Sequence, residues 1–263
     1  MRSDGTRTTH SQDLRGTPAR RNLPAYDVQA FRSALDQFMR VTDSQGRVWA
    51  DAKWGAYAFY DYDGEPIYVG QTNEKLRTRV RRHLTNQRTD AVAMRILDVF
   101  EVAEVEIWPL WDLQTTSNSD RDAIQRLNSL EYSAYLNAIR NSKFRAILNE
   151  KLPPLSNAIE LPESLRYSLI DERTRQEQGH PDIRIARRAE TIARLAAVAR
   201  ERGEVSLGLR RVLVIQAVRL TYLASERLAF AEGRKAPLPS SINVEELLGP
   251  SLDLLDDIDG SED

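Results

Sequence analysis

The chain has 263 residues and a formal net charge of −2, so it is long enough for one or two domains with a sizeable core and does not indicate a polyanion binder as a whole. It contains no cysteine, which excludes disulfides and Cys-ligated zinc or iron–sulfur sites and leaves hard cations such as Mg²⁺ as the class of metal to expect. No apolar run reaches membrane-spanning length and no apolar signal segment is visible near the N-terminus, so we expect a soluble, cytoplasmic protein that does not bind membranes.

The first elements are a basic arm and a short helix. Residues 1–24 are polar, Arg-rich and aperiodic, which predicts a disordered arm. Asp27 is a candidate cap for the helix that follows, whose apolar residues recur at helical spacing: Val28, Phe31, Leu35 and Phe38. Residues 43–53, around Gly46, are predicted to form a loop or short hairpin.

A β-hairpin follows, and it carries the most informative residues of the chain. Gly55-Ala56-Tyr57 and Tyr68-Val69-Gly70 flank an Asp-Gly step, and aromatic and β-branched residues lie on both sides of it. This pattern predicts strands at 55–60 and 65–69. The two tyrosines should therefore lie near each other on a small sheet.

The next segments alternate between helix and strand. Residues 74–87 predict a helix that buries Leu76, Val80 and Leu84, and residues 90–100 predict a second helix. Residues 104–108 alternate as a third strand, and a polar loop at 114–120 offers Ser119 or Asp120 as the cap of a long helix that runs to about residue 150.

Beyond residue 160 the pattern becomes helical, with candidates at 162–178, 182–202 and 207–232. Residues 236–263 are rich in acidic residues and have no basic residue, which predicts a disordered tail that either solvates the protein or mimics DNA. We therefore expect an α+β domain at 25–160 with a three-stranded antiparallel sheet flanked by helices, a helical domain at 161–235, and disordered ends at 1–24 and 236–263.

Glu131 is the carboxylate with the most unusual surroundings. On a helical wheel it lies in the middle of an apolar arc formed by Ile124, Leu127, Ala134, Tyr135 and Ala138. A carboxylate there is costly unless it is paired or bound to a cation. It is either one half of a buried ion pair with an arginine or a metal ligand, and the tyrosines upstream favour the metal.

Arg79 and His83 share a face of the helix predicted at 74–87. Arg79 could bind a phosphate through two hydrogen bonds. Its charge could lower the pKa of Tyr57 and so make Tyr57 a general base, and His83 could relay a proton. Further arginines on this segment either face solvent or contact DNA: Arg77, Arg81, Arg82 and Arg88.

The order and spacing of these residues resemble the GIY-YIG nuclease superfamily over about residues 54–157. The resemblance implies a DNA endonuclease that uses one divalent metal, Mg²⁺ or Mn²⁺. It implies Tyr57 as the general base, Tyr68 as its support, and Arg79 on the scissile phosphate. It further implies a catalytic role for His83, a metal on Glu131, and, after Pro153-Pro154, Asn157 as the family asparagine.

Several alternatives stay open. The gap between Tyr68 and the helix arginine is one residue longer than usual in the family, so Arg77 competes with Arg79. The arginines of residues 182–202 belong either to a DNA-tracking helix or to a bundle helix with its arginines in solvent. The protein is a restriction or defence nuclease that acts as a homodimer, a repair nuclease, or a DNA-binding or assembly module whose nuclease fold is inactive.

Overall fold

The computed structural model describes residues 24–85 and 98–249. The arm predicted at 1–24 lies outside the described residues except for its last residue, and so do Arg88, most of the helix predicted at 90–100, and the tail beyond residue 249. Residues 98–100 are the described part of this predicted helix, and for them the prediction is wrong. Asp98 instead caps the 3₁₀-helix η3 (Val99–Glu101).

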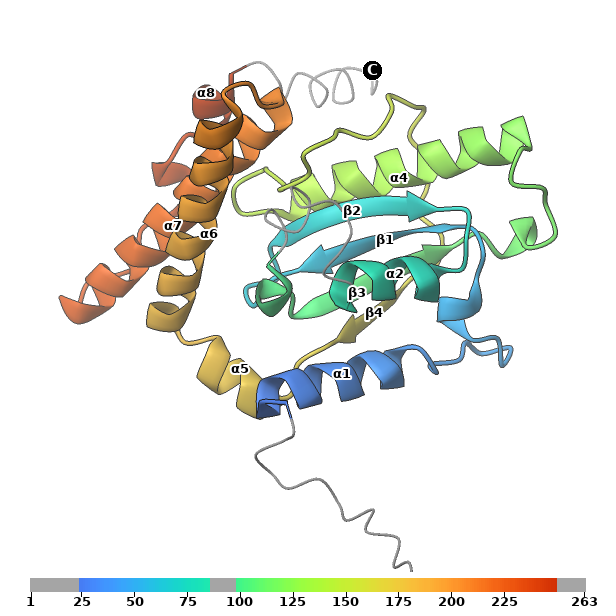
Figure 1. The fold of residues 1–263 in the computed structure, drawn as a ribbon, viewed down its shortest axis with the longest axis horizontal. Helices are drawn as coiled ribbons and strands as arrows, with labels where there is room; N and C mark the ends of the chain where they lie inside the picture. The colour runs from blue at the N-terminus through green and yellow to red at the C-terminus, as the bar shows by residue number, and fades with distance from the viewer. Residues whose placement is uncertain (1–23, 86–97, 250–263) are drawn as a thin grey trace, which may run out of the picture.

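The described chain forms one antiparallel sheet flanked by helices, which confirms the predicted α+β class (Figure 1). Its strands are β1 (Gly55–Tyr60), β2 (Pro66–Thr72), β3 (Glu104–Pro109) and β4 (Leu165–Ser168), in the order β2-β1-β3-β4. The central strand β1 is buried along its whole length, whereas β2 lies at one edge.

The fourth strand corrects the prediction of three strands and of a helix at 162–178. Leu165 and Tyr167 pack against the hydrophobic core, while Arg166 pairs with Glu104 on the neighbouring strand. This alternation is that of a half-buried strand. Because β4 pairs with β3, the sheet extends past residue 160, into the segment assigned to the helical domain, of which α5 (Glu172–Gln178) is the first helix.

Two helices cover the two faces of the sheet near β1 and β2. Tyr57 and Phe59 share a core cluster with α2 (Leu76–Thr85), whereas Ala56, Ala58 and Tyr60 pack with α4 (Arg121–Asn141). The period of two along β1 therefore sends its side chains alternately toward α2 and toward α4.

Helix α4 ends at Asn141, about nine residues before the predicted end. The carboxylate of Glu65 accepts hydrogen bonds from the Ser142 hydroxyl (2.6 Å) and from the Lys143 backbone N–H (2.7 Å). These hydrogen bonds to the Glu65 carboxylate compete with the backbone hydrogen bonds that would continue the helix. Asp120 caps the start of the helix by accepting from the Ala123 N–H, as the sequence predicts.

Helix α1 (Tyr26–Phe38) begins two residues earlier than a cap at Asp27 would allow, because Ala25 occupies the N-cap position. Asp27 lies in the first turn, where a negative charge favours the positive end of the helix dipole. The 3₁₀-helices η2 (Trp49–Asp51) and η4 (Trp111–Leu113) complete this part of the fold.

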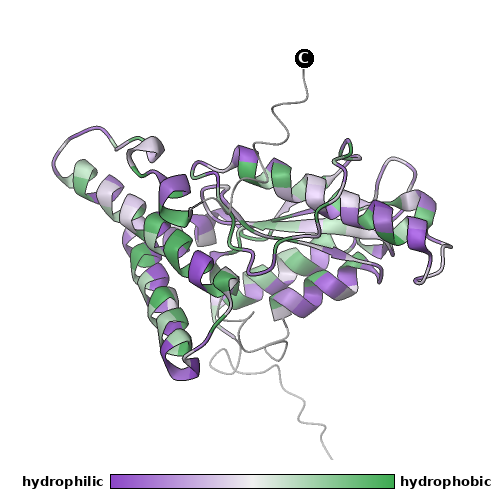
Figure 2. Cartoon of the chain, turned by 90° about the horizontal axis from the view of Figure 1, so that it is seen from above, coloured by the Kyte–Doolittle hydropathy of each residue, from purple (hydrophilic) through white to green (hydrophobic). Residues whose placement is uncertain are grey.

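The C-terminal region is helical from residue 172, and α6 (Pro181–Arg202) packs along α7 (Leu207–Ala231) beside the sheet (Figure 1). Figure 2 shows that most helices carry both hydrophilic and hydrophobic residues, as expected of helices with one side on a core. The 3₁₀-helix η5 (Pro239–Ser241) and α8 (Val244–Leu248) follow, and Val244 is buried. The prediction of disorder is therefore wrong for residues 236–249.

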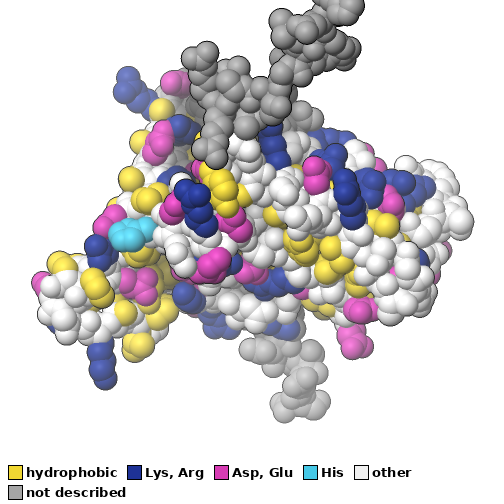
Figure 3. Space-filling model, turned by 90° about the horizontal axis from the view of Figure 1, so that it is seen from below, with side chains coloured by type: hydrophobic (Ala, Val, Ile, Leu, Met, Phe, Trp, Pro, Cys, Tyr) yellow, Lys and Arg dark blue, Asp and Glu magenta, His cyan; other side chains and the backbone are white. Residues whose placement is uncertain are grey.

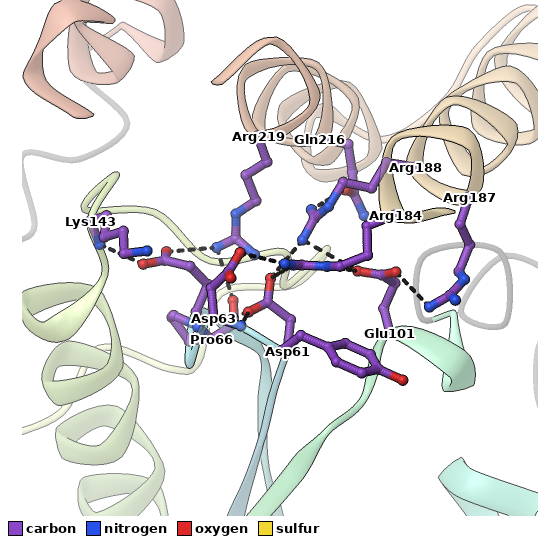
Figure 4. A network of polar contacts seen from close by, with 12 residues as sticks. Asp61, Asp63, Pro66, Glu101, Lys143, Arg184, Arg187, Arg188, Gln216 and Arg219 are labelled. Atoms are coloured by element: carbon purple, nitrogen blue, oxygen red, sulfur yellow. Dashed lines mark hydrogen bonds and ion pairs between the residues drawn. The ribbon is translucent and has the colours of Figure 1, made fainter. Parts of the chain in front are cut away.

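The α6 arginines hold the tip of the β1–β2 hairpin (Figure 4). Asp61, which is 1 % exposed, pairs with Arg188 at 2.6 Å and with Arg184 at 3.2 Å. Burial favours a higher pKa for Asp61, but these arginines outweigh it and lower the pKa. The alternative of a bundle helix is therefore correct for α6, which packs along α7, but the expectation that its arginines lie in solvent or on DNA is wrong for Arg184 and Arg188, which are buried.

The same hairpin is also held from α7. Arg219 donates hydrogen bonds to the backbone oxygens of Pro66 (3.0 Å) and Ala146 (2.9 Å), and it lies 3.6 Å from the Glu65 carboxylate. The hairpin that carries both tyrosines is thus fixed at its tip by charged groups from two C-terminal helices.

Candidate active site

Gly70 leaves room for the Tyr57 side chain, and Gly55 leaves room for the backbone of β3. Gly70 is the register partner of Tyr57 on β2, and a Cβ at Gly70 would lie 2.6 Å from the Tyr57 hydroxyl oxygen. At Gly55, a Cβ would lie 2.5 Å from the backbone oxygen of Trp108. Each glycine is therefore required by the close approach of another group.

The Tyr57 hydroxyl joins two side chains of α2. The Arg79 Nε donates to it at 3.2 Å, and the His83 Nε2 lies 2.9 Å from it. Because an arginine only donates, the hydroxyl oxygen is an acceptor toward Arg79. Donation of the Tyr57 proton to His83 requires the tautomer of His83 that carries its proton on Nδ1.

The pKa values of this pair differ from the sequence expectation. Burial raises the pKa of Tyr57 well above 10, and the Arg79 charge that lowers it does not compensate. Arg79 therefore acts in the expected direction, but the net shift of the Tyr57 pKa is upward because burial outweighs it. Burial, assisted by Arg79 and Arg82, lowers the pKa of His83 to about 4. At neutral pH the pair is a protonated phenol beside a neutral imidazole.

Tyr68 lies diagonally across from Tyr57, because its register partner on β1 is Phe59. Its ring centroid lies 6.0 Å from that of Tyr57 and 5.3 Å from that of His83. Burial raises the pKa of Tyr68, the Arg79 charge opposes this, and the Glu131 charge adds to it. The charges of Arg79 on α2 and of Glu131 on α4 therefore both act on the Tyr68 hydroxyl.

Glu131 reaches the same edge of the sheet from α4 and is partly buried. Burial raises its pKa to about 7 against the attraction of Arg79, and no hydrogen bond from a described residue contributes to this pKa. The buried ion pair with an arginine that the sequence left open is not formed among the described residues.

The donor chemistry at Glu131 fits a hard divalent cation. A desolvated carboxylate without a hydrogen-bond donor is stabilised by such an ion. Within residues 24–85 and 98–249, no group of three or more His, Cys, Asp or Glu side chains is placed to hold a metal. Glu131 is the residue that would hold such an ion here.

The remaining arginines of α2 are engaged elsewhere. Arg77 lies 2.8 Å from Asp51 and donates to the Met39 backbone oxygen, so the structure brings Arg79, and not Arg77, to Tyr57. Arg81 pairs with Asp36 and Arg82 pairs with Glu74. Figure 3 shows basic and acidic side chains interspersed over the face that it presents. A role for these arginines in DNA binding stays a prediction.

Asn149 is an asparagine that contacts the hairpin backbone and that sequence reasoning missed. Its side-chain amide donates to the Val69 backbone oxygen (2.8 Å) and accepts from the Val69 N–H (2.9 Å), so it caps the edge strand beside Tyr68. Asn157 is exposed and lies in a different hollow, against the outer side of α4. The signal for Asn149 is its place after Ile147-Leu148, which are buried.

Comparison with known proteins agrees with this geometry. Residues 53–118 match the family model of the GIY-YIG catalytic domain, which includes both tyrosines, Arg79 and His83 and stops before Glu131. At the level of the family this match indicates a nuclease, an enzyme that hydrolyses phosphodiester bonds. A search of curated proteins and a search of solved structures each give no match.

Proposed function

We propose that this chain, whose residues 53–118 match the GIY-YIG catalytic domain, is a metal-dependent DNA endonuclease acting in the cytoplasm. The observation that carries the proposal is the Tyr57 hydroxyl held between Arg79 and His83 at one edge of the sheet. The Glu131 carboxylate at the same edge, which has no ion pair or hydrogen bond with a described residue, supplies the place for a cation.

The raised pKa of Tyr57 calls for a proton relay rather than a stable phenolate. As the attacking water gives a proton to the Tyr57 hydroxyl oxygen, the Tyr57 proton passes to the His83 Nε2 2.9 Å away. The hydroxide forms a bond to phosphorus, the bond to the 3′ oxygen breaks, and this oxygen takes a proton from solvent. The neighbouring arginines favour rapid return of the His83 proton to solvent.

Arg79 has two tasks in this scheme. Its Nε orients Tyr57, and the rest of the guanidinium neutralises charge that develops on the phosphate. Tyr68 holds the attacking water beside Tyr57. A Mg²⁺ or Mn²⁺ ion bound at Glu131 supplies Lewis-acid stabilisation of the phosphate and of the leaving oxygen.

The test is cleavage of supercoiled plasmid by the purified protein with Mg²⁺, with EDTA, and with the Glu131→Ala variant. Metal-dependent cutting that is lost in the variant supports the proposal. Discrete fragments would favour restriction or defence, with a homodimer cutting both strands, whereas nicks would favour repair. Absence of cutting on plasmid, branched and single-stranded DNA with either metal would contradict the proposal and favour a DNA-binding or assembly module.

A further inference from the structure

We infer that the hollow between α4 and residues 154–157 binds a nucleotide of the DNA a few base pairs from the scissile phosphate and reads its base. The inference rests on the proposed function and adds a specificity site to it. The hollow has a volume of about 420 Å³, which suits a ligand group of the size of a nucleotide.

The lining of this hollow has the chemistry that reads bases. Gln125 and Asn128 come from α4, Asn157 comes from the opposite wall, and Arg121 lies at the first turn of the helix. Amide side chains can exchange two hydrogen bonds with one base, and arginine can do so with guanine. Side chains of these kinds gathered around one hollow favour a base over a sugar or an apolar ligand.

The outer wall adds apolar contacts. Pro154 and Leu155 line the hollow, and Leu155 is 73 % exposed. Leucine and proline are among the apolar side chains that proteins insert between base steps in nucleic-acid complexes.

The wall is held in place on both sides. Leu152 and Leu161 pack against the core cluster beneath α4, and the Ile159 N–H donates to the Ser133 hydroxyl at 2.8 Å. Pro153 and Pro154 fix their own backbone φ angles. Residues 154–157 are therefore already ordered, so ligand binding does not cost the entropy of ordering this segment.

One hydrogen bond links the lining of the hollow to the hairpin of the candidate active site. Gln71 follows Gly70 on β2, and its Nε2 donates to the Asn128 side-chain oxygen at 2.9 Å. The Gln71 side-chain oxygen is buried and receives no hydrogen bond from a described residue. This oxygen lies between the two sites and is placed to accept a hydrogen bond from the substrate or from a bound water.

The spacing along α4 agrees with neighbouring nucleotides. Gln125 precedes Glu131 by about 9 Å along the helix axis at about 1.5 Å per residue. Base pairs in DNA repeat at about 3.4 Å along one strand. A phosphate at Arg79 and Glu131 would therefore place a base in the hollow roughly two to three base pairs away.

The test compares the wild type with the double variant Gln125→Ala/Asn157→Ala and with Asn141→Ala, an exposed asparagine on the same helix outside the hollow. Binding to a short fluorescent duplex is measured in EDTA, and sequence preference is measured by cutting duplexes randomised beside the cut. Thermal melts check that every variant is folded.

We expect the double variant to bind DNA about tenfold more weakly and to lose its preference at one or two positions beside the cut. Asn141→Ala should match the wild type. Unchanged binding and an unchanged sequence profile in the double variant would overturn the inference while leaving the nuclease proposal intact. Weaker binding by the double variant, with no cutting by the wild type, would contradict the nuclease proposal and support the hollow as a DNA site. A wild type that binds no DNA would overturn both.

Discussion

Tyr57 and His83 are joined through a hydrogen bond of 2.9 Å, although they are 26 residues apart and come from a strand and a helix. The Arg79 Nε donates to the same hydroxyl oxygen, and the proposed relay uses the His83 tautomer whose Nε2 accepts from Tyr57. Most of the chemistry proposed for this protein depends on this one contact.

The first prediction concerns this pair. Tyr57→Phe and His83→Ala should each reduce the cleavage rate by about 10²–10⁴-fold, because each removes one partner of the proton transfer. The double variant should be little worse than either single variant, since residues that act as a unit are not additive. Cleavage rates at saturating DNA in the four proteins measure this. Losses that multiply would show that the two residues act independently.

The second prediction concerns the charge state of His83. Its pKa of about 4 is below the ordinary value of about 6.5, so the unfolded chain binds more protons than the folded chain between these values. Stability contributed by neutral His83 is therefore present above about pH 6.5 and is lost as the pH falls toward 4. NMR of the imidazole should show no titration of His83 between pH 8 and about pH 5.

The third prediction concerns the Glu131 carboxylate. Its pKa of about 7 in the folded protein exceeds the ordinary value of about 4.3, so the folded chain binds more protons in this interval and stability falls as the pH rises through it. In EDTA, Glu131→Gln should therefore be more stable than the wild type at pH 8 but not near pH 4, and it should not cut DNA. Denaturant unfolding at both pH values measures this. Equal stabilities at pH 8 would contradict the raised pKa.

The fourth prediction concerns the glycine beneath the tyrosine. Gly70→Ala should destabilise the fold by about 1–3 kcal/mol, because the new methyl group meets the Tyr57 ring and hydroxyl. In a Tyr57→Phe background the cost should be smaller, since the nearest atom, the hydroxyl oxygen, is gone. Chemical denaturation of the four proteins gives this coupling. Equal costs in both backgrounds would show that the clash is relieved elsewhere.

The fifth prediction concerns the hairpin tip. Asp61→Asn should cost about 3–5 kcal/mol, since it leaves Arg184 and Arg188 buried with a weakened partner. Asp112→Asn, which weakens an exposed pair with Arg126, should cost about 0–1 kcal/mol and is the matched control. A loss of similar size in both variants would show that the buried network does not hold the hairpin.

The sequence by itself determined the hairpin, the row of Leu76, Val80 and Leu84, and the common face of Arg79 and His83. These features depend on local periodicity and on the turn residues at Asp63-Gly64, which act over a few neighbouring positions. The resemblance to a nuclease family, carried by the same short segments, is confirmed by the match over residues 53–118.

Only the tertiary structure decided which arginine meets Tyr57, since Arg77 and Arg79 are alike in sequence but differ in the partners that surround them. It also decided that burial outweighs Arg79 in setting the Tyr57 pKa, because desolvation depends on all neighbours at once.

The early end of α4, the fourth strand and the burial of two α6 arginines each depend on a contact with another part of the chain. Ser142 contacts the Glu65 carboxylate, residues 165–168 pair with β3, and Arg184 and Arg188 pair with Asp61. Each partner is distant in the chain. Helical periodicity indicates which residues share a face, but the free energy of burying a charge depends on what that face meets.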